Sequence, residues 1–513
     1  MNDIHATSQL DEKEDLKNND DSQIRKFYAG KCIFLTGCIG FLGSVILEKI
    51  LRTCVDIGKV YVMIRPKKGM SMEDRVKERF RNVLFDKVHQ LNPNFVEKIV
   101  PIYGDLQKTD LALSPEDRRC LIENVDIIIH NASLVYFEAK ASHLLRANVI
   151  GTQKMLELAT ECRHLKAFVY VSTAYSHLYN KVIEEKFYPP PADVKLIEQI
   201  IRADEEKEFG ISQNRIHDIV GQWTNLYTFS KATTEGLIED FSRTASFPCI
   251  VFRPSIVTPP YEEPIPSWIG NQNGPIALTI GISLGIVHVV NTQEDMLLDL
   301  IPADMMTNGL LASIWDSVLH RKSKEPQVYN YASSDWNPIS FGLARAATLK
   351  GTYKYPSLKM VWYPFVLYVQ NFYVLFVFHV LFHVIPASIA DIVLVARRKK
   401  PMAISAVWRV MKFFRILSHF ITSSWIIKSD NLKDVQTRMN AADLKEFPFD
   451  LNVVDWYRLI ESALLGFRQI LKDTPESLPA AKRKYQRLMT FHYIVCSFLV
   501  LFLLFFLYRA MCF

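Results

Sequence analysis

Two residues four positions apart, Tyr227 and Lys231, are the side chains in this sequence best suited to acid–base chemistry. They stand at the start of a stretch, Phe229–Ser246, whose apolar periodicity predicts a helix. A spacing of four places both side chains on one helical face. An ammonium near a phenol lowers the pKa of the phenol, which can then donate a proton to a carbonyl oxygen that is being reduced.

A pair of hydroxyl residues, Ser172 and Thr173, ends a predicted strand, Phe168–Val171. Ligands of parallel sheets bind at the carboxyl edge of the strands. A hydroxyl there can hydrogen-bond the oxygen of a substrate. We predict Thr173 in this role and keep Ser172 as the alternative, so the predicted catalytic set is Thr173, Tyr227 and Lys231.

A glycine-rich turn between a predicted strand and a predicted helix has the form of a dinucleotide phosphate site. Gly37 permits the tight turn, Gly40 lets the backbone approach a pyrophosphate, and Gly43 lets the helix pack on the strand. The helix N-terminus supplies N–H groups and partial positive charge for the anion. The residues of this turn predicted to contact the cofactor are Thr36, Gly37, Gly40, Phe41, Leu42 and Gly43.

The loop after the second predicted strand indicates which dinucleotide is bound. NAD-binding proteins usually have an acid there for the ribose 2′-hydroxyl, but this sequence has Arg65 and Lys67. Cations attract a 2′-phosphate, which favours NADPH over NADH. Asp105 and Leu106 follow the third strand, and Asn131 follows the fourth, where they extend the predicted cofactor site.

Alternating strands and helices must position these residues. Short apolar runs alternate with amphipathic stretches, which predicts an α/β fold of the Rossmann type, a doubly wound parallel sheet with helices on both faces. The predicted strands are Cys32–Leu35, Val60–Ile64, Ile99–Tyr103, Ile127–His130, Phe168–Val171 and Ile250–Phe252. The predicted helices are Phe41–Arg52, Met72–Leu84, Pro115–Asn124, Ala141–Cys162 and Phe229–Ser246.

Length and composition narrow the class of protein. A chain of 513 residues is long enough for two or three domains. A net charge of +6 is too small to indicate nucleic acid as the main partner. The eight cysteines have no zinc spacing, so we expect reduced thiols and no metal site. The polar, acidic residues 1–27 are predicted to be a disordered tail.

An apolar stretch near the end of the chain predicts a membrane anchor over residues 489–508. The basic run Lys482–Arg487 precedes it, which by the positive-inside rule leaves the catalytic part in the cytosol. A second apolar stretch, Met360–Pro386, is long enough to span a bilayer or to form a re-entrant hairpin, and it could also be a monotopic apolar surface or the wall of an acyl tunnel. These alternatives stay open at this point.

Together these motifs resemble those of the eukaryotic fatty acyl-CoA reductases, within the extended short-chain dehydrogenase/reductase superfamily. The matching segments are TGCIGFLG (36–43), VYVMIRPKK (60–68), GDL (104–106), HNAS (130–133), YVSTAY (170–175), YPPP (188–191), YTFSK (227–231), RPSIV (253–257), NGP (273–275) and LPAAKRK (478–484). The resemblance covers about residues 28–490. It adds Pro254, Ser255 and Ile256 to the expected cofactor site.

The resemblance implies a reaction and a domain layout. A long-chain acyl-CoA would be reduced through a thiohemiacetal and an aldehyde to a primary alcohol, with two NADPH consumed and CoA released. An NADP-binding reductase domain with a smaller substrate subdomain would occupy residues 28–340, and a helical C-terminal domain residues 355–470. The membrane would be that of the peroxisome or the endoplasmic reticulum, and a homo-oligomer stays open.

Two other functions share some of these features. A membrane-bound hydroxysteroid or sterol dehydrogenase of the same superfamily would have the glycine turn and the Tyr–Lys pair, but not the roughly 150 residues between the α/β unit and the anchor. A non-catalytic nucleotide-binding scaffold would be expected to lack Tyr227 or Lys231. Both residues are present.

Overall fold

The computed structural model describes residues 21–65, 69–135, 140–270, 275–321 and 326–511. Its chain forms two compact units that interleave in sequence. Unit 1 comprises Met1–Pro266, Asp299–Pro338 and Trp425–Val454. Unit 2 comprises Ser267–Leu298, Ile339–Ser424 and Asp455–Phe513.

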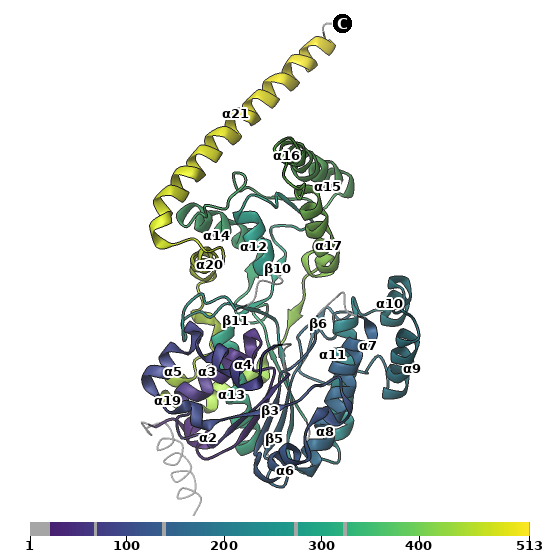
Figure 1. Ribbon diagram of the computed structural model, residues 1–513, viewed down its shortest axis with the longest axis vertical. Coiled ribbons are helices and arrows are strands. Elements are labelled where there is room, and N and C mark those ends of the chain that lie inside the picture. The colour runs from purple at the N-terminus through teal and green to yellow at the C-terminus, as the bar shows by residue number, and fades with distance from the viewer. Residues whose placement is uncertain (1–20, 66–68, 136–139, 271–274, 322–325, 512–513) are drawn as a thin grey trace, which may run out of the picture. The chain divides into compact units, whose positions relative to one another are not determined.

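Unit 1 is built on a seven-stranded parallel sheet in the order β12-β7-β5-β4-β1-β2-β3 (Figure 1). The strand order reverses between β1 and β4, and such a switch point is where open α/β sheets bind ligands. This topology confirms the predicted doubly wound fold. The strands are β1 (Ile33–Thr36), β2 (Val60–Ile64), β3 (Ile99–Tyr103), β4 (Ile127–His130), β5 (Ala167–Val171), β7 (Cys249–Pro254) and β12 (Gln327–Tyr331).

Helices cover both faces of this sheet (Figure 1). On one face α3 (Phe41–Thr53) packs against α13 (Ala303–Leu319). On the other lie α6 (Pro115–Asn124), α8 (Gly151–Glu161) and α11 (Leu226–Ser242). Further helices of unit 1 are α4 (Met72–Phe80), α5 (Asp86–Leu91), α7 (Ala141–Leu145), α9 (Val194–Glu205), α10 (Gln213–Val220), α18 (Asp430–Arg438) and α19 (Ala441–Glu446).

Short elements complete unit 1. A π-helical turn, η4 (Arg146–Ile150), joins α7 to α8, so the predicted helix Ala141–Cys162 is continuous but not uniform. The 3₁₀ turns are η1 (Val83–Phe85), η2 (Phe95–Lys98), η3 (Thr109–Ala112) and η6 (Leu451–Val453). Two parallel two-stranded pairs join β6 (Val182–Ile183) to β15 (Ile426–Ile427) and β8 (Ile256–Thr258) to β11 (Leu300–Pro302).

The expected disordered tail of residues 1–27 is wrong for its last residues. Helix α2 (Gln23–Tyr28) begins at the cap Ser22, and its Ile24 is fully buried. The Ser22 hydroxyl donates to the Asp443 carboxylate at 2.7 Å. The apolar face of this short helix is therefore part of the core of unit 1. Residues 1–20 lie outside the described residues.

Unit 2 is mainly helical. Its helices α12 (Pro275–Ser283), α14 (Phe341–Lys354) and α20 (Trp456–Ile470) pack together. Two small sheets pair β9 (Val289–Val290) with β14 (Leu367–Tyr368) and β10 (Leu297–Leu298) with β13 (Ile339–Ser340). The remaining elements are α15 (Phe372–His379), η5 (Val380–Val384), α16 (Ile385–Ala396), α17 (Ala403–Ile421), η7 (Pro475–Ser477) and α21 (Leu478–Met511).

Candidate active site

The glycine turn after β1 is so tight that side chains do not fit at two of its positions. A Cβ atom on Gly43 would lie 2.1 Å from the Gly37 carbonyl oxygen. Gly37 has a φ of +75°, and a Cβ there would lie 3.0 Å from the Ala132 backbone. The turn delivers the chain directly into α3, whose first N–H groups, at Phe41 and Leu42, are suited to an anion.

Arg79 of α4 adds a cation to this turn. Its Nε donates to the Ser44 hydroxyl at 2.7 Å, and its Nη2 donates to the Gly40 carbonyl at 3.2 Å. The guanidinium therefore lies against the N-terminus of α3, where it would reinforce anion binding. Arg79 could not be predicted from the sequence, because no motif links it to a turn about 35 residues earlier.

The predicted selector for the dinucleotide lies at the end of β2. Arg65 directly follows the strand and is exposed, and its carbonyl oxygen accepts a hydrogen bond from the Arg75 guanidinium. Lys67 falls outside the described residues. Arg65 and Arg75 thus lie together at the carboxyl end of β2.

The predicted cofactor residues after β3 and β4 have defined local roles. The Asp105 carboxylate accepts from the Gln107 N–H at 3.0 Å, which fixes the turn. Leu106 packs against Gly151, where a Cβ would lie 2.6 Å from the Leu106 carbonyl oxygen. Asn131 lies beside the glycine turn, its amide nitrogen 3.0 Å from the Cβ position of Gly37. The structure therefore brings Asn131 and the glycine turn together.

A buried hydrogen-bonded chain joins the ends of β1 and β4. The Thr36 hydroxyl lies 2.9 Å from His130 Nδ1 and accepts from the Ala132 N–H at 2.9 Å. His130 Nε2 lies 2.9 Å from the Thr152 hydroxyl. Burial, with a smaller effect of Lys231, lowers the His130 pKa to about 3. The imidazole is therefore neutral, and its contacts with Thr36 and Thr152 link the ends of β1 and β4 to α8.

The predicted catalytic residues converge on the carboxyl end of β5. Lys231 is 2% exposed, and its Nζ donates to the Val171 carbonyl at 2.7 Å. The same Nζ lies 5.9 Å from the ring centre of Tyr227. Thr173, 7% exposed, is two residues beyond Val171. The helix begins at Leu226, three residues before the predicted start, because Asn225 caps it through the Thr228 N–H at 2.9 Å.

Burial dominates the titration of this pair. It lowers the pKa of Lys231 to about 7, against an opposing effect of Glu235. It raises the pKa of Tyr227. The sequence predicted a lowered pKa for Tyr227, but without a bound cofactor burial raises it. The phenol therefore keeps its proton at neutral pH.

A buried carboxylate one turn after Lys231 organises the surroundings of the site. Glu235 is 1% exposed and accepts hydrogen bonds from Ser172, from Ser176 at 3.0 Å and from His177 at 2.9 Å. It also accepts from Arg253 Nε at 3.0 Å and Nη2 at 2.6 Å. We call these residues the Glu235 network. Burial opposes ionisation, but Arg253 and His177 hold the Glu235 pKa well below its usual range.

Glu235 was not predicted from the sequence either. Two signals mark it: an acid four residues after Lys231 on the same helical face, and an arginine within the apolar strand β7. An arginine is almost never fully buried unless it is paired, so Arg253 predicts a buried acid somewhere near the strand.

The two hydroxyls at the end of β5 differ in their partners. The Ser172 hydroxyl donates to Glu235 within the core. The Thr173 hydroxyl accepts from the Tyr175 N–H at 3.3 Å, and its own proton is not committed to Glu235. This difference favours Thr173 over Ser172 as the residue that faces a substrate.

Pro254, Ser255 and Ile256, at the end of β7 and the start of β8, adjoin the same edge. The Pro254 carbonyl accepts from the Ala174 N–H at 2.9 Å, which ties the segment to the residue after Thr173. The Ile256 N–H donates to the Asp299 carbonyl at 3.2 Å. Within the described parts of the chain, the buried Ser255 hydroxyl has no hydrogen-bond partner. A hydroxyl of this kind at a ligand-binding edge fits a bound polar group.

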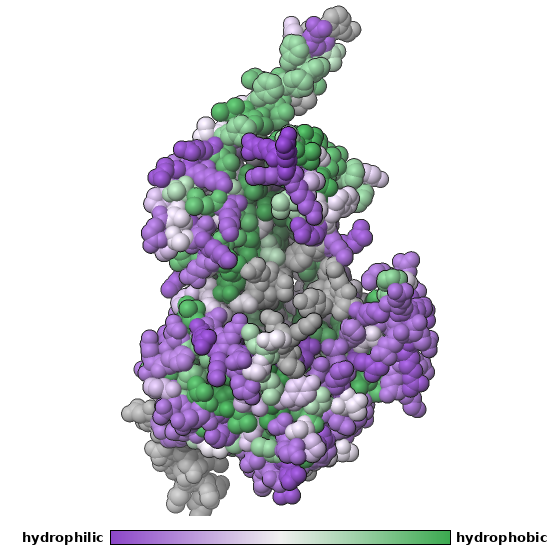
Figure 2. Space-filling view, viewed as in Figure 1, coloured by the Kyte–Doolittle hydropathy of each residue, from purple (hydrophilic) through white to green (hydrophobic). Residues whose placement is uncertain are grey.

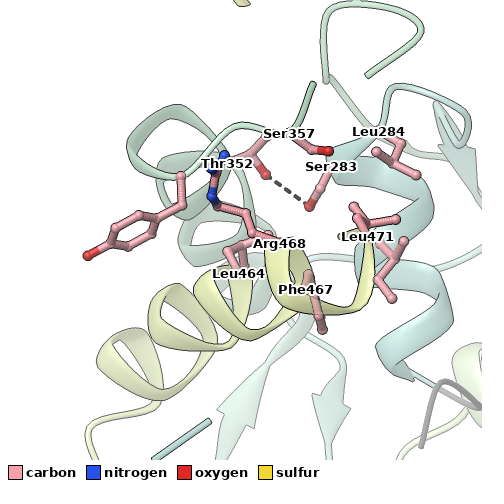
Figure 3. A pocket seen from close by; sticks show the side chains of 10 residues that line it. Ser283, Leu284, Thr352, Ser357, Leu464, Phe467, Arg468 and Leu471 are labelled. Atoms are coloured by element: carbon pink, nitrogen blue, oxygen red, sulfur yellow. Dashed lines mark hydrogen bonds between the residues drawn. The ribbon is translucent and has the colours of Figure 1, made fainter. Parts of the chain in front are cut away.

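Unit 2 has an apolar cavity of its own, between α12, α14 and α20 (Figure 3). Thr352 donates to the Ser283 hydroxyl at 2.9 Å on one wall, and Leu464 and Phe467 line another. The interior space is about 10 Å³, enough for about one water molecule. The cavity is too small for an acyl chain.

Comparisons with known families cover most of the chain. A family model described as "Male sterility protein", an NAD-binding domain, matches residues 35–310. A second model with the same description matches residues 382–473.

Individual relatives match at about one third identity. "Fatty acyl-CoA reductase wat" of Drosophila melanogaster is 32% identical over 475 residues, covering 92% of this chain and 90% of the relative. "Fatty acyl-CoA reductase 1" of Rattus norvegicus is 33% identical over 480 residues, covering 93% and 92%. "Fatty acyl-CoA reductase 2" of Homo sapiens is 33% identical over 474 residues, covering 92% and 91%.

Solved structures share the fold. The reductase domain of a nonribosomal peptide synthetase from Mycobacterium tuberculosis matches with a TM-score of 0.59 at 18% identity, covering 90% of this chain and 98% of that one. The terminal R domain of the myxalamid PKS-NRPS pathway matches with a TM-score of 0.57 at 20% identity, covering 86% and 91%.

Proposed function

Because this chain belongs to the fatty acyl-CoA reductase family, we propose that it reduces a long-chain fatty acyl-CoA to the primary alcohol and releases CoA. The observation that carries the proposal is the match over more than nine tenths of the chain, combined with Tyr227, Lys231 and Thr173 at one strand end. The sterol dehydrogenase and scaffold alternatives are not favoured, since the relatives matched over this length are named as acyl-CoA reductases.

The chain has a nicotinamide dinucleotide-binding domain, and its residues fit that cofactor. Gly37 and Gly43 allow the tight turn before α3, because a Cβ atom at either position would lie too close to the Ala132 backbone or to the Gly37 carbonyl oxygen. The helix start at Phe41 and Leu42, with Arg79 beside it, would hold the pyrophosphate. The residues that would line the rest of the cofactor are Thr36, Gly40, Asp105, Leu106, Asn131, Pro254, Ser255, Ile256, Tyr227 and Lys231.

NADPH is the proposed form of the cofactor. Arg65 stands directly after β2, where an acid would select NADH, and no acid follows it before the next helix. A guanidinium makes charge-assisted hydrogen bonds to a 2′-phosphate. Lys67 remains a predicted second contact.

Each of the two reductions adds a hydride to the carbonyl carbon and a proton to its oxygen. The dinucleotide, when bound, supplies the hydride. Thr173 and Tyr227 hold the oxygen by hydrogen bonds as negative charge develops on it, an oxyanion-stabilising role. The Tyr227 hydroxyl gives the proton, and burial keeps that proton in place until it is needed.

Lys231 supports this proton donor. An ammonium has three donors, and the bond to the Val171 carbonyl uses one of them. The others are available to ribose hydroxyls and, through them, to the phenol. After the first reduction the carbon–sulfur bond breaks, the hydroxyl proton passes to the departing CoA sulfur, and the aldehyde remains for the second reduction.

The test is direct. The purified protein is incubated with NADPH and acyl-CoAs of graded chain length, and the products are identified by mass. We expect primary alcohol, free CoA and two NADPH oxidised per alcohol. NADPH oxidation that requires a sterol, or no oxidation with any acyl-CoA or aldehyde, would contradict the proposal.

The C-terminal helix α21 is proposed to anchor the protein in a membrane. The helix is apolar and exposed over its second half (Figure 2), and the segment Pro475–Met511 is long enough to cross a bilayer. The first three turns of α21 carry four cations, Lys482, Arg483, Lys484 and Arg487. By the positive-inside rule this end of the helix, and the catalytic unit before it, face the cytosol. The membrane is that of the peroxisome or the endoplasmic reticulum, and fractionation of tagged protein against organelle markers distinguishes them.

A further inference from the structure

The second apolar helix in the structure is exposed along most of its length. α15, η5 and α16 form one continuous helix, Phe372–Ala396, and only 11% of its most apolar part is buried. The side chains that are more than half exposed include Phe372, Tyr373, Phe376, Ile389, Ile392 and Val395. A surface of this kind marks a membrane or protein contact.

The middle of this helix is bonded to the folded part of unit 2. His383 is 6% exposed, and its Nε2 accepts from the His288 N–H at 2.9 Å. His288 immediately precedes β9, which pairs with β14, and its ring nitrogen lies 3.0 Å from the Phe365 carbonyl. The helix therefore lies along the small sheet formed by β9 and β14.

The C-terminal end of the helix also returns to unit 2. The Asp391 carboxylate accepts from the N–H groups of Met402 and Ala403, each at 2.8 Å, at the start of α17. α17 in turn packs Phe414 and Leu417 against the apolar core of unit 2. The helix is thus held at its middle and near its end.

These attachments are incompatible with a crossing of the bilayer. At 1.5 Å per residue, the 25-residue helix is about 38 Å long, and a crossing would place His383 near the bilayer centre. His288 and the open-edged pair β9–β14 would then enter hydrocarbon, where unpaired strand edges are excluded. The helix can instead lie in the plane of one leaflet, with its exposed face in the acyl region.

Four consecutive cations follow the helix. Arg397, Arg398, Lys399 and Lys400 are all exposed. Within residues 326–511 no ion pair joins them to an acid, and Asp391 is engaged by the start of α17. Trp408, 69% exposed, lies in the second turn of α17, and tryptophan favours the membrane–water interface.

We propose that Phe372–Ala396 lies within one leaflet and that the loop Arg397–Lys400 binds anionic lipid headgroups. The charge of the loop and the apolar face beside it fit an anionic bilayer surface. This attachment is separate from α21, and it holds unit 2 flat against the membrane from which a long-chain substrate would enter.

The first experiment measures the lipid preference of the full-length chain after α21 has been made too polar to enter a membrane. Phe498, Leu501, Phe502 and Phe505 are each more than half exposed, and replacing them by Gln removes the apolar surface of the anchor. We expect this variant to float with vesicles containing phosphatidylserine on the order of 10²-fold more than with phosphatidylcholine vesicles. Added Gln replacements of Arg397, Arg398, Lys399 and Lys400 remove that preference.

A matched control removes four exposed cations elsewhere. In the control, Gln replaces four cations on and around α9 and α10: Lys195, Arg202, Lys207 and Arg215. This change lowers the net charge as much as the loop replacements do, and it should leave the lipid preference intact. An equal loss in the control would overturn the assignment to the loop. Absence of any preference for phosphatidylserine, or a dimer that covers the Phe372–Ala396 face in solution, would overturn the lipid proposal.

The second experiment tests the orientation of the helix. Gln370→Cys and Lys400→Cys, placed singly in the wild-type chain, flank the helix. In sealed microsomes both should react with an impermeant maleimide from the same side, above the background of the native cysteines. Reaction from opposite sides would show a crossing and refute the in-plane placement.

Discussion

Replacing Glu235 by Gln tests how unit 1 positions its catalytic residues. The carboxylate accepts hydrogen bonds from Arg253 on β7 and from Ser172, Ser176 and His177 after β5. The change leaves Arg253, fully buried, without its counter-charge. Breaking a buried ion pair at one partner costs about 3–5 kcal/mol, so the free energy of unfolding should fall by roughly that amount.

The same change should move the pH dependence of the reaction. Burial lowers the Lys231 pKa to about 7, and Glu235 opposes that effect. Without the negative charge, Lys231 loses its proton at lower pH, and the alkaline limb of the rate profile should move down by about one pH unit or more. A role in folding alone would change stability and leave this limb in place.

Two variants separate these effects. Glu239→Gln changes a more exposed acid one turn later on the same helix and should alter stability by no more than about 0.5 kcal/mol. Glu235→Gln with Arg253→Met removes both charges and should recover much of the stability while keeping the displaced alkaline limb. Urea unfolding and rate–pH profiles measure both quantities. A Glu235→Gln protein with unchanged stability and profile would refute the reasoning.

Three further predictions concern the cofactor site and the core. Gly43→Ala places a Cβ 2.1 Å from the Gly37 carbonyl oxygen. We expect the free energy of unfolding to fall by about 1–3 kcal/mol, and titration with NADPH to show that binding is lost. Arg65→Asp should weaken NADPH about 10–100-fold and NADH little; unchanged preference would remove Arg65 from the 2′-phosphate site. Although burial opposes it, Lys49 and Arg52 lower the Glu263 pKa to about 2. The Glu263 carboxylate therefore contributes its full stabilisation above pH about 4.5, and this contribution is lost as the pH falls towards 2. In Glu263→Gln, the free energy of unfolding should depend less on pH over this range.

The sheet, and the position of Tyr227 and Lys231 on one helix, could be predicted from the sequence because their signals are local. Each central strand is a short run of buried apolar residues, and Tyr227 and Lys231 are four residues apart on one helix. The Glu235 network could not be read in the same way, because its members come from β5, α11 and β7, far apart in the chain. The sequence holds only two indirect signals of this network, the acid four residues after Lys231 and the arginine at position 253 in an apolar run.

Other features depend on contacts that no local pattern encodes. Trp425–Val454 belongs to unit 1 although the chain before and after it belongs to unit 2. Asn330 of β12 donates to the Lys428 carbonyl at 2.8 Å, a contact across 98 residues. The apolar pattern of Met360–Pro386 leaves open whether this segment spans a bilayer, and the bond from the His288 N–H to His383, on which the proposed in-plane placement rests, joins residues 95 positions apart.

The central claim is that Tyr227 gives the proton in both reductions of an acyl-CoA, and one measurement tests it most directly. Alcohol formation is compared in wild type and Tyr227→Phe, from acyl-CoA and from added aldehyde, with NADPH binding measured on the same samples. We predict intact NADPH binding and a rate lower by about 10²–10⁴-fold on both substrates. Near-normal turnover of either substrate by Tyr227→Phe would contradict the account.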